Sequence, residues 1–202
     1  MADPPSKPPK IGFLGGTFDP IHCGHALILK QAIRELELEC LLLCPAFQAP
    51  LRDRPPLFTA TQRLEMASLM ANEHPRTTVF DYEIKHKKTS YTWNTIQEVK
   101  KLYPQSKIYL LIGFDQFLQL PKWRFIRELS KEVHFAVFAR GQPRQVPPQS
   151  FDLSFTLMNN SLISTSSTSI RKKIQKRKSI KGLVPDTIHS YLQDNHLLIN
   201  SS

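Results

Sequence analysis

Short apolar runs alternate with longer amphipathic segments along most of the chain. The apolar runs predict buried parallel strands at residues 11–14, 40–44, 77–80, 107–112 and 133–138. Between them, apolar residues at helical spacing predict helices at residues 25–36, 59–72, 91–103 and 122–129. After residue 151 the pattern predicts a short strand and two helices that pack on the same domain. Such alternation is typical of an α/β fold with a doubly wound parallel sheet.

The length and composition fit one globular domain. The 202 residues, 41% of them hydrophobic, suffice for a sizeable core. We expect a flexible leader at residues 1–10 and a single domain at residues 11–202, with C-terminal helices from about residue 166. No stretch approaches the roughly 20 consecutive apolar residues of a membrane span. The N-terminus lacks the apolar segment of a secretory signal, so we expect a cytoplasmic protein without membrane contact.

Two proline-rich segments interrupt the alternation. Residues 45–58 follow the second predicted strand, and residues 141–150 follow the fifth. In doubly wound sheets, ligands bind beyond the carboxyl ends of the strands. The first segment is therefore placed to form a lid, although a passive connection explains its composition equally well.

The net charge of +10 raises nucleic acid as a partner. Much of the excess lies in the tract RKKIQKRKSIK at residues 171–181. This basic tract fits a solvated helix face, a site for a small polyphosphate or, third, a nucleic-acid surface. Because the sequence has no basic patch interleaved with aromatic residues and no known nucleic-acid motif, we expect no nucleic-acid partner.

The stretch GGTFDPIHCGH, residues 15–25, carries the strongest chemical signal. It joins the first strand to the first helix, whose N-terminus offers N–H groups and a positive dipole end to phosphate. Gly15 and Gly16 allow a sharp turn and a close approach to a ligand. The stretch matches neither GxxxxGK[ST] nor GxGxxG. Instead it supplies two imidazoles, His22 and His25, whose protonated forms are favoured near phosphates; they are too few for a zinc site.

Four motifs resemble those of nicotinate-nucleotide adenylyltransferases, within the HxGH nucleotidyltransferase superfamily. GGTFDPIHCGH is similar to the family's GGTFDPxHxGH, and TSSTSIR at residues 165–171 to ISSTxIR. SYTWNTI at residues 90–96 is similar to SYTxxTL, and IGFDQFLQLPKW at residues 112–123 to IGxDxLxxxPxW. The motifs follow the family's order. The resemblance implies a Rossmann-like nucleotidyltransferase sheet with a small C-terminal helical portion.

The resemblance also implies a late reaction of NAD biosynthesis. In it, ATP and nicotinate mononucleotide give nicotinate adenine dinucleotide (deamido-NAD) and pyrophosphate. Because the attacking phosphate is already anionic, catalysis should consist of alignment and electrostatic stabilisation rather than strong base chemistry. Mg²⁺ is implied with ATP, held by phosphates and water rather than by protein ligands.

Site residues carry over from the resemblance motif by motif. The implied catalytic residues, in contact with the ATP phosphates, are His22, His25 and Arg171. Further ATP-binding positions are Gly15, Gly16, Thr17, Phe18, Asp115, Ser166, Ser167 and Thr168. The implied positions for nicotinate mononucleotide are Thr92, Trp93, Trp123 and Arg124.

Three of these positions have specific implied roles. Asp115 would accept hydrogen bonds from ribose hydroxyls, and Trp123 would stack on the pyridine ring. Thr92, with backbone N–H groups at Trp93 and Arg124, would receive the nicotinate carboxylate. Backbone donors pair better with a carboxylate than with an amide NH₂, so the acid should be preferred over nicotinamide.

One loop departs from the family pattern, and two alternatives stay open. The family's PxxxPPHK appears as PAFQAPLR at residues 45–52, with Leu51 in place of the histidine, which leaves the strictness of acid selectivity open. A pantetheine-phosphate adenylyltransferase or cytidylyltransferase shares HxGH, but SYTWNT and PKW favour the nicotinate branch. A nucleic-acid binder built on a degenerate enzyme is disfavoured by the intact histidines. Assembly into a homo-oligomer also stays open.

Overall fold

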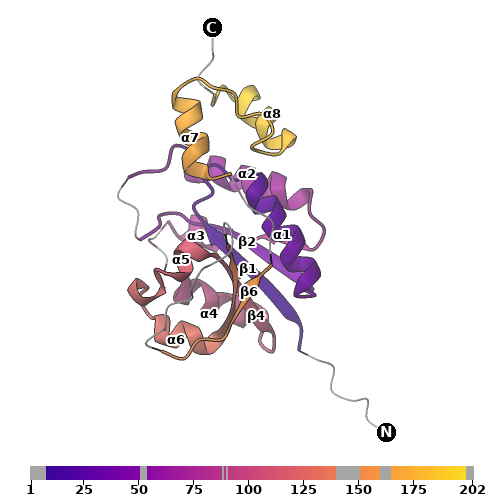
Figure 1. The fold of residues 1–202 in the computed structure, drawn as a ribbon, viewed down its shortest axis with the longest axis vertical. Helices are drawn as coiled ribbons and strands as arrows, with labels where there is room; N and C mark the ends of the chain where they lie inside the picture. The colour runs from indigo at the N-terminus through magenta and orange to yellow at the C-terminus, as the bar shows by residue number, and fades with distance from the viewer. Residues whose placement is uncertain are drawn as a thin grey trace.

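The computed structural model describes residues 8–50, 54–87, 89, 91–139, 151–159 and 165–198. Its centre is one six-stranded sheet with the order β3-β2-β1-β4-β5-β6. The strands are β1 (Lys10–Gly16), β2 (Cys40–Pro45), β3 (Thr77–Val79), β4 (Lys107–Gly113), β5 (Val133–Phe138) and β6 (Phe155–Met158). All neighbouring strands pair in parallel. The predicted doubly wound α/β fold is confirmed (Figure 1).

Helices cover both faces of the sheet (Figure 1). They are α1 (Cys23–Glu35), α2 (Ala60–Asn72), α3 (Tyr82–His86), α4 (Thr92–Leu102), α5 (Phe114–Phe117), α6 (Ile126–Glu132), α7 (Ser167–Gln175) and α8 (Asp186–Asp194), with a 3₁₀ helix, η1 (Leu120–Lys122). Within the described ranges, every helix is too short or too polar to cross a lipid bilayer.

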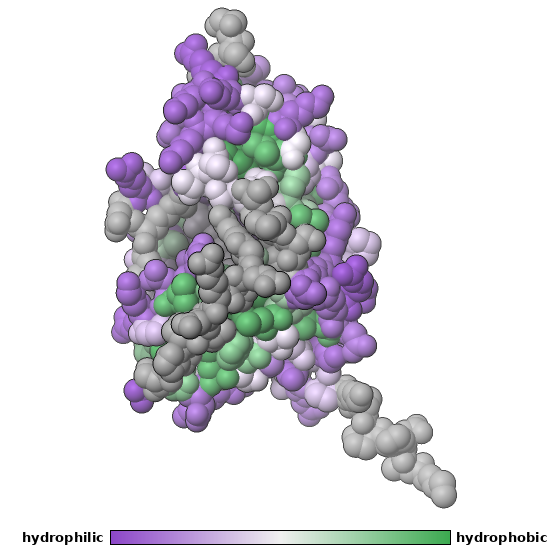
Figure 2. Space-filling model, viewed as in Figure 1, coloured by the Kyte–Doolittle hydropathy of each residue, from purple (hydrophilic) through white to green (hydrophobic). Residues whose placement is uncertain are grey.

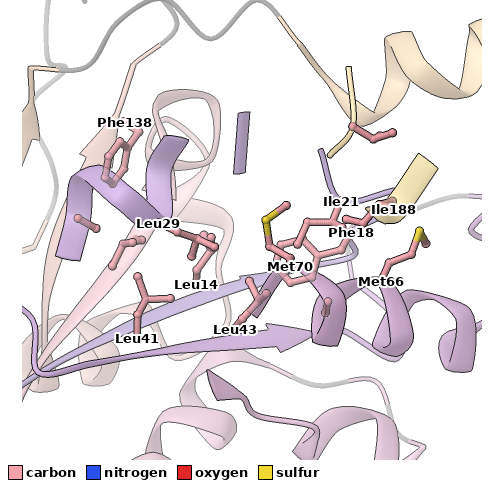
Figure 3. Packing of buried hydrophobic residues seen from close by; sticks show 14 of the residues in the cluster. Leu14, Phe18, Ile21, Leu29, Leu41, Leu43, Met66, Met70, Phe138 and Ile188 are labelled. Carbon is pink, nitrogen blue, oxygen red and sulfur yellow. The ribbon is translucent and has the colours of Figure 1, made fainter. Parts of the chain in front are cut away.

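The hydrophobic core is split by the sheet into two clusters. One cluster packs α1, α2, α7 and α8 against the sheet, and the other packs α4, α5 and α6. Figure 3 shows the first cluster, where Leu14 and Leu43 of the sheet lie among Leu29 and Met66 of the helices. Ile188 of α8 belongs to the same cluster. The C-terminal helices therefore extend the α1–α2 side of the core, with α8 packed against α2 (Figure 1).

One predicted helix is placed differently in the structure. The expected helix at residues 122–129 is replaced by η1, which ends at Lys122, and by α6, which begins at Ile126. Phe125 has a left-handed backbone with φ of 62°, a conformation that cannot continue a right-handed helix. The interruption leaves Trp123 and Arg124 in an irregular segment. The short helices α3, α5 and η1 were not predicted as separate elements.

Candidate active site

The two histidines of the first motif cap helix α1. His22 is the N-cap residue, and its Nδ1 accepts a hydrogen bond from the Gly24 N–H at 3.1 Å. The Nδ1 of His25 accepts one from the His22 N–H, also at 3.1 Å. Together the bonds form a reciprocal capping box, which satisfies two N–H groups that have no acceptor within the helix. The three-residue spacing is therefore that of N-cap and N3 positions.

The capping bonds also fix the tautomer of both rings. An Nδ1 that accepts a hydrogen bond carries no proton, so each ring holds its proton on Nε2. The ring centroids lie 3.9 Å apart with a tilt of 39°. In this arrangement each ring presents an Nε2–H group as a donor.

The turn after β1 is made by residues other than the two glycines. Gly15 and Gly16 are the last residues of β1, and the backbone turns instead at Phe18, with φ of 51°, and at the cis Asp19–Pro20 bond. Gly16 is required for another reason: a Cβ there would lie 2.9 Å from the Phe18 ring. That ring is buried and meets His25 edge-on, with centroids 5.2 Å apart.

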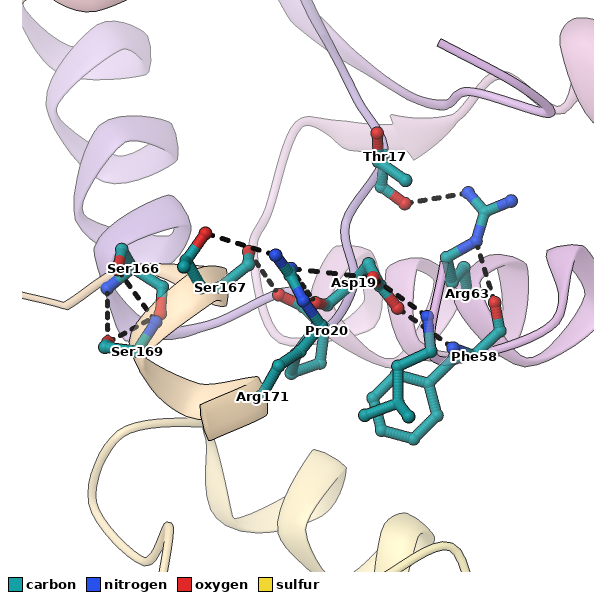
Figure 4. A network of polar contacts seen from close by, with 11 residues as sticks. Thr17, Asp19, Pro20, Phe58, Arg63, Ser166, Ser167, Ser169 and Arg171 are labelled. Carbon is teal, nitrogen blue, oxygen red and sulfur yellow. Dashed lines mark hydrogen bonds and ion pairs between the residues drawn. The ribbon is translucent and has the colours of Figure 1, made fainter. Parts of the chain in front are cut away.

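The second motif lies directly against this turn, although it is far away in the sequence (Figure 4). Arg171 donates a hydrogen bond to the Asp19 carbonyl at 2.8 Å and lies 3.5 Å from the Asp19 carboxylate. The Ser167 hydroxyl donates to the Pro20 carbonyl at 2.9 Å. Asp19 is only 1% exposed, and its carboxylate also accepts bonds from the N–H groups of Leu57 and Phe58. The fold therefore brings the motifs at residues 15–25 and 165–171 together at one site.

Helix α7 begins at this junction with its own capping box. The Ser166 hydroxyl accepts from the Ser169 N–H at 3.1 Å, and the Ser169 hydroxyl accepts from the Ser166 N–H. The Thr168 hydroxyl accepts a bond from Arg171 at 3.1 Å. Three hydroxyls implied as ATP ligands, those of Ser166, Ser167 and Thr168, thus also stabilise the start of α7. The helix N-terminus, with its positive dipole end, lies beside the turn that holds His22.

The residues implied for the mononucleotide gather at the start of α4. Thr92 and Trp93 are the first two residues of that helix, where backbone N–H groups have no intrahelical acceptor. The Arg124 guanidinium lies 5.0 Å from the centre of the Tyr91 ring and 4.8 Å from that of Phe125. The residue directly after the motif at 112–123 is therefore in contact with the motif at 90–96.

Trp123 and Asp115 complete the implied set. Trp123 is half-buried and packs against the same core cluster as Trp93. Asp115 is exposed and lies in the first turn of α5, directly after β4. Gly113, not Asp115, is the N-cap of that short helix. The carboxylate therefore has no capping role and lies at the carboxyl end of the strand beside β1.

Comparisons with known proteins agree with this arrangement. The profile of the cytidylyltransferase-like family matches residues 13–173. A protein of Exiguobacterium sibiricum named "probable nicotinate-nucleotide adenylyltransferase" is 34% identical over 188 residues, covering 93% of this chain and 98% of that protein. The chain belongs to this family. An Oceanobacillus iheyensis protein of the same name is 36% identical and covers 93% of the chain and 96% of its own length.

A solved structure supports the fold of this nicotinate-nucleotide adenylyltransferase family member. The structure titled "Plasmodium falciparum nicotinic acid mononucleotide adenylyltransferase complexed with NaAD" has a TM-score of 0.78. It is 21% identical, and the alignment covers 96% of this chain and 98% of that one. The family resemblance inferred from the motifs is confirmed by these matches.

A buried arginine that the sequence analysis did not single out holds the loops of the site together (Figure 4). Arg63 of α2 is 1% exposed. It donates to the carbonyls of Thr17 at 2.7 Å, Phe58 at 3.2 Å and Phe47 at 3.1 Å, and also to that of Ala46. These carbonyls belong to the loops after β1 and β2 and to the approach to α2. The guanidinium fork thus ties three chain segments to one rigid helix.

The sequence carried a signal for this role. Arg63 lies on the same helical stripe as Met66, Ala67 and Met70, which are fully buried. A charged residue within an apolar i, i+3, i+4, i+7 stripe must be satisfied inside the protein.

The proline-rich segment after β2 is tied down at its beginning. The Ala46 N–H donates to the Gly16 carbonyl at 2.8 Å, and Gln48 forms a β-bridge with Thr89, shortly before α4. This places the start of the segment between the histidine loop and the implied mononucleotide residues. Leu51 and Arg52, the positions that depart from the family pattern, lie outside the described residues, as does the segment at 141–150.

The buried carboxyl group of Glu83 is hydrogen-bonded to helix α4. The Thr95 hydroxyl of α4 donates to Glu83 at 2.7 Å. Burial raises the pKa of Glu83 to about 7, although hydrogen bonds from Thr95 and Cys44 oppose this shift. Burial likewise raises the pKa of the Cys44 thiol well above its ordinary value. The base of the mononucleotide side therefore contains an acid that titrates near neutral pH.

Proposed function

We propose that this protein transfers the adenylyl group of ATP to nicotinate mononucleotide and releases pyrophosphate. The observation that carries the proposal is the contact of Arg171 and Ser167 with the turn at Asp19 and Pro20. That contact brings both superfamily motifs, each with a helix N-terminus, to one place beside the sheet. A cluster of this kind suits a triphosphate, whose negative charge requires several convergent donors.

In the reaction, a phosphate oxygen of the mononucleotide attacks the α-phosphorus of ATP. A new P–O bond forms, and the bond from the α-phosphorus to the β-phosphate oxygen breaks, so pyrophosphate leaves with the electron pair. The Nε2–H groups of His22 and His25 donate to oxygens of the α-phosphate as charge grows there. Backbone N–H groups at Gly16, Thr17 and Phe18 add fixed donors. Because the capping box holds both rings in place beforehand, little reorganisation is needed at the transition state.

The leaving group is held on the α7 side. Arg171 and the first turn of α7, with Ser166 and Thr168, bind the β- and γ-phosphates. The anchoring of Arg171 on the Asp19 carbonyl, at 2.8 Å, supports this because it holds the guanidinium at the edge of the histidine loop. Asp115 accepts hydrogen bonds from the ATP ribose.

Mg²⁺ bound with ATP would neutralise part of the triphosphate charge. Among the described residues, no group of three or more histidine, cysteine, aspartate or glutamate side chains could hold a metal ion. We expect the ion to be held mainly by phosphates and water, as is usual for Mg²⁺. We further propose that the protein acts in the cytoplasm on small molecules, without nucleic acid.

The mononucleotide lies on the α4 side. The N–H groups of Thr92 and Trp93 and that of Arg124 receive the nicotinate carboxylate, and Trp123 stacks on the pyridine ring. A carboxylate accepts from every donor at such a site, whereas an amide presents its NH₂ to some of them and leaves donors unpaired. Nicotinate is therefore preferred over nicotinamide mononucleotide.

Pyrophosphate release from ATP tests the proposal directly. The purified protein is assayed with nicotinate mononucleotide, nicotinamide mononucleotide and phosphopantetheine as separate acceptors. We expect kcat/KM for nicotinate mononucleotide to exceed that for nicotinamide mononucleotide by about tenfold or more, the discrimination that unpaired donors provide. Faster turnover of phosphopantetheine would assign the protein to another branch of the superfamily. Absence of turnover with all three acceptors would contradict the proposal.

A further inference from the structure

The basic tract at residues 171–181 is divided by the fold between two places. Arg171 faces the Asp19 turn at the start of α7, as described above. The cations after the end of α7 surround a separate cavity of about 220 Å³. Arg177, Lys178 and Lys181 line it from the turn that follows α7, and His189 lines it from α8. Figure 2 shows hydrophilic residues gathered over this part of the molecule, at the top of the view.

This cavity is distinct from the proposed active site. Helix α7 has nine residues, so its two ends lie about 13 Å apart. Its first turn contacts the Asp19–Pro20 turn, and its last turn borders the cavity at Ile174. None of the residues that we assign to ATP or to the mononucleotide lines the cavity.

The charges around the cavity are not balanced by the protein. Among the described residues that line it, none is acidic. In the portion of the chain that the structure describes, no salt bridge involves Arg177, Lys178 or Lys181. Three like charges converging on one hollow repel one another, and an anion bound between them relieves that repulsion.

The turn that carries these cations is held in a defined conformation. Backbone N–H groups of Arg177 and Lys178 cap the last carbonyls of α7, donating to Ile174 at 2.9 Å and Lys173 at 2.8 Å. Ile180 is fully buried against the core cluster. The three cations therefore extend, exposed to solvent, from a turn after the helix whose backbone is fixed.

The chemistry of the lining indicates the ligand. Guanidinium and ammonium groups are the usual partners of phosphate oxygens. The Ser179 hydroxyl accepts from the Lys181 N–H at 3.2 Å, so its own proton is free to be donated to an anion. The floor is apolar, with Ile174 and Ile180. The volume is below the roughly 300–1,000 Å³ of sites for drug-sized ligands, which favours a small ligand.

We propose that this cavity binds a small phosphorylated anion: a phosphoryl group held by Arg177, Lys178 and Lys181, with any compact apolar part against Ile174 and Ile180. A nucleic-acid surface is the less favoured occupant because the described lining has no phenylalanine, tyrosine or tryptophan to stack on bases.

Inorganic phosphate is the probe that tests this site. Backbone amide shifts of the full-length protein are followed during a phosphate titration at constant ionic strength, with a non-hydrolysable ATP analogue saturating the active site. We expect saturable shifts at residues 177–182 and at His189. The double variant Lys178→Gln/Lys181→Gln should lose about tenfold or more in phosphate affinity, since charge-assisted hydrogen bonds are removed. Its adenylyl-transfer activity should stay unchanged.

A matched variant separates a site from general charge attraction. Lys172→Gln/Lys176→Gln removes two cations from the same basic tract, but neither residue lines the cavity. It should keep phosphate affinity within about twofold, since neither side chain lines the cavity and a charge outside the site acts only through solvent. Equal loss in both variants, or shifts that never saturate, would overturn the proposal. Tighter binding of a single-stranded oligonucleotide than of phosphate, lost in the first variant, would overturn it in favour of nucleic acid.

Discussion

The candidate active site has two sides that are built by different means. The phosphate side contains Asp19, His22, His25 and Arg171, and the proposed pyridine side contains Thr92, Trp93, Trp123 and Arg124. On the phosphate side, polar groups are buried and multiply bonded: His22 is 4% exposed, and Asp19 accepts from two backbone N–H groups and lies against Arg171. On the pyridine side, Arg124 is exposed and is held by the faces of Tyr91 and Phe125. Stabilising charge at phosphorus requires donors fixed before the reaction, whereas a flat ring is captured mainly by apolar surface, with N–H donors needed only for its carboxylate. Changes on the two sides should therefore affect different kinetic constants.

The largest expected effect comes from the phosphate side. His25→Ala should lower kcat by about 10²–10³, the loss seen when one preorganised donor to a transition state is removed. The change is measured by steady-state pyrophosphate release at saturating concentrations of both substrates. A loss of less than threefold would mean that the ring only caps α1.

His25→Asn is the matched control for that cap. An asparagine at this position offers an oxygen to the His22 N–H but has no counterpart of the Nε2–H group. Its free energy of unfolding should stay within about 1 kcal/mol of wild type, the usual scale of a capping bond. Its kcat should still fall as in His25→Ala. Wild-type turnover in this variant would contradict the assigned role.

Arg63 tests whether the two sides depend on a common support. Arg63→Met leaves carbonyls of Thr17, Phe47 and Phe58 without their buried donor, and we expect the free energy of unfolding to fall by about 3 kcal/mol. Because these carbonyls belong to loops on both sides, the KM values for ATP and for the mononucleotide should rise together. Urea unfolding and steady-state kinetics measure the two effects. Reduced stability with both KM values unchanged would limit Arg63 to a structural role.

Arg63→Lys provides the control for charge. It keeps a cation in the core, but a single ammonium cannot reach the carbonyls that the planar fork joins. Both KM values should therefore still rise, although less than in Arg63→Met.

The parts of the molecule that sequence could predict are those encoded by local pattern. The strands of the sheet followed from short apolar runs, and helix α2 from apolar residues at helical spacing. The histidine motif was placed correctly between β1 and α1, since a strand, a glycine pair and a helix start are all visible within a few residues. The internal geometry of this motif was not predicted, because the capping box of His22 and His25 depends on the backbone conformation.

The features that sequence missed depend on contacts between distant segments. Arg63 bonds to Thr17 and Phe47, and Arg171 to Asp19, across separations that no local pattern encodes. The break between η1 and α6 arises at Phe125, whose left-handed backbone is unusual for a large aromatic residue. Helical spacing alone could not reveal it.

Glu83 allows the base of the pyridine side to be probed by pH. Its folded pKa of about 7 lies above the ordinary value of 4.5, so the folded state retains this proton longer than the unfolded state. Stability is therefore lost as pH rises through this interval. Relative to Glu83→Gln, which stays neutral, wild type should lose about 2–3 kcal/mol of unfolding free energy between pH 5 and pH 8. The unfolding free energies are measured by urea unfolding at each pH. An equal change with pH in both proteins would contradict the raised pKa of Glu83.

The smallest effect, and the one that separates the two sides most directly, is expected at Trp123. Trp123→Ala should raise the KM for nicotinate mononucleotide about tenfold, since an aromatic side chain stacked on a base contributes about 1–3 kcal/mol. The KM for ATP should stay within about twofold, because Trp123 packs with the α4–α6 cluster and not with the histidine loop. Trp123→Phe, which keeps an aromatic face, should recover most of the loss. A selective rise in the KM for ATP would mean that the two substrates have been assigned to the wrong sides. The contrast between fixed donors on one side and stacked rings on the other would then be wrong as well.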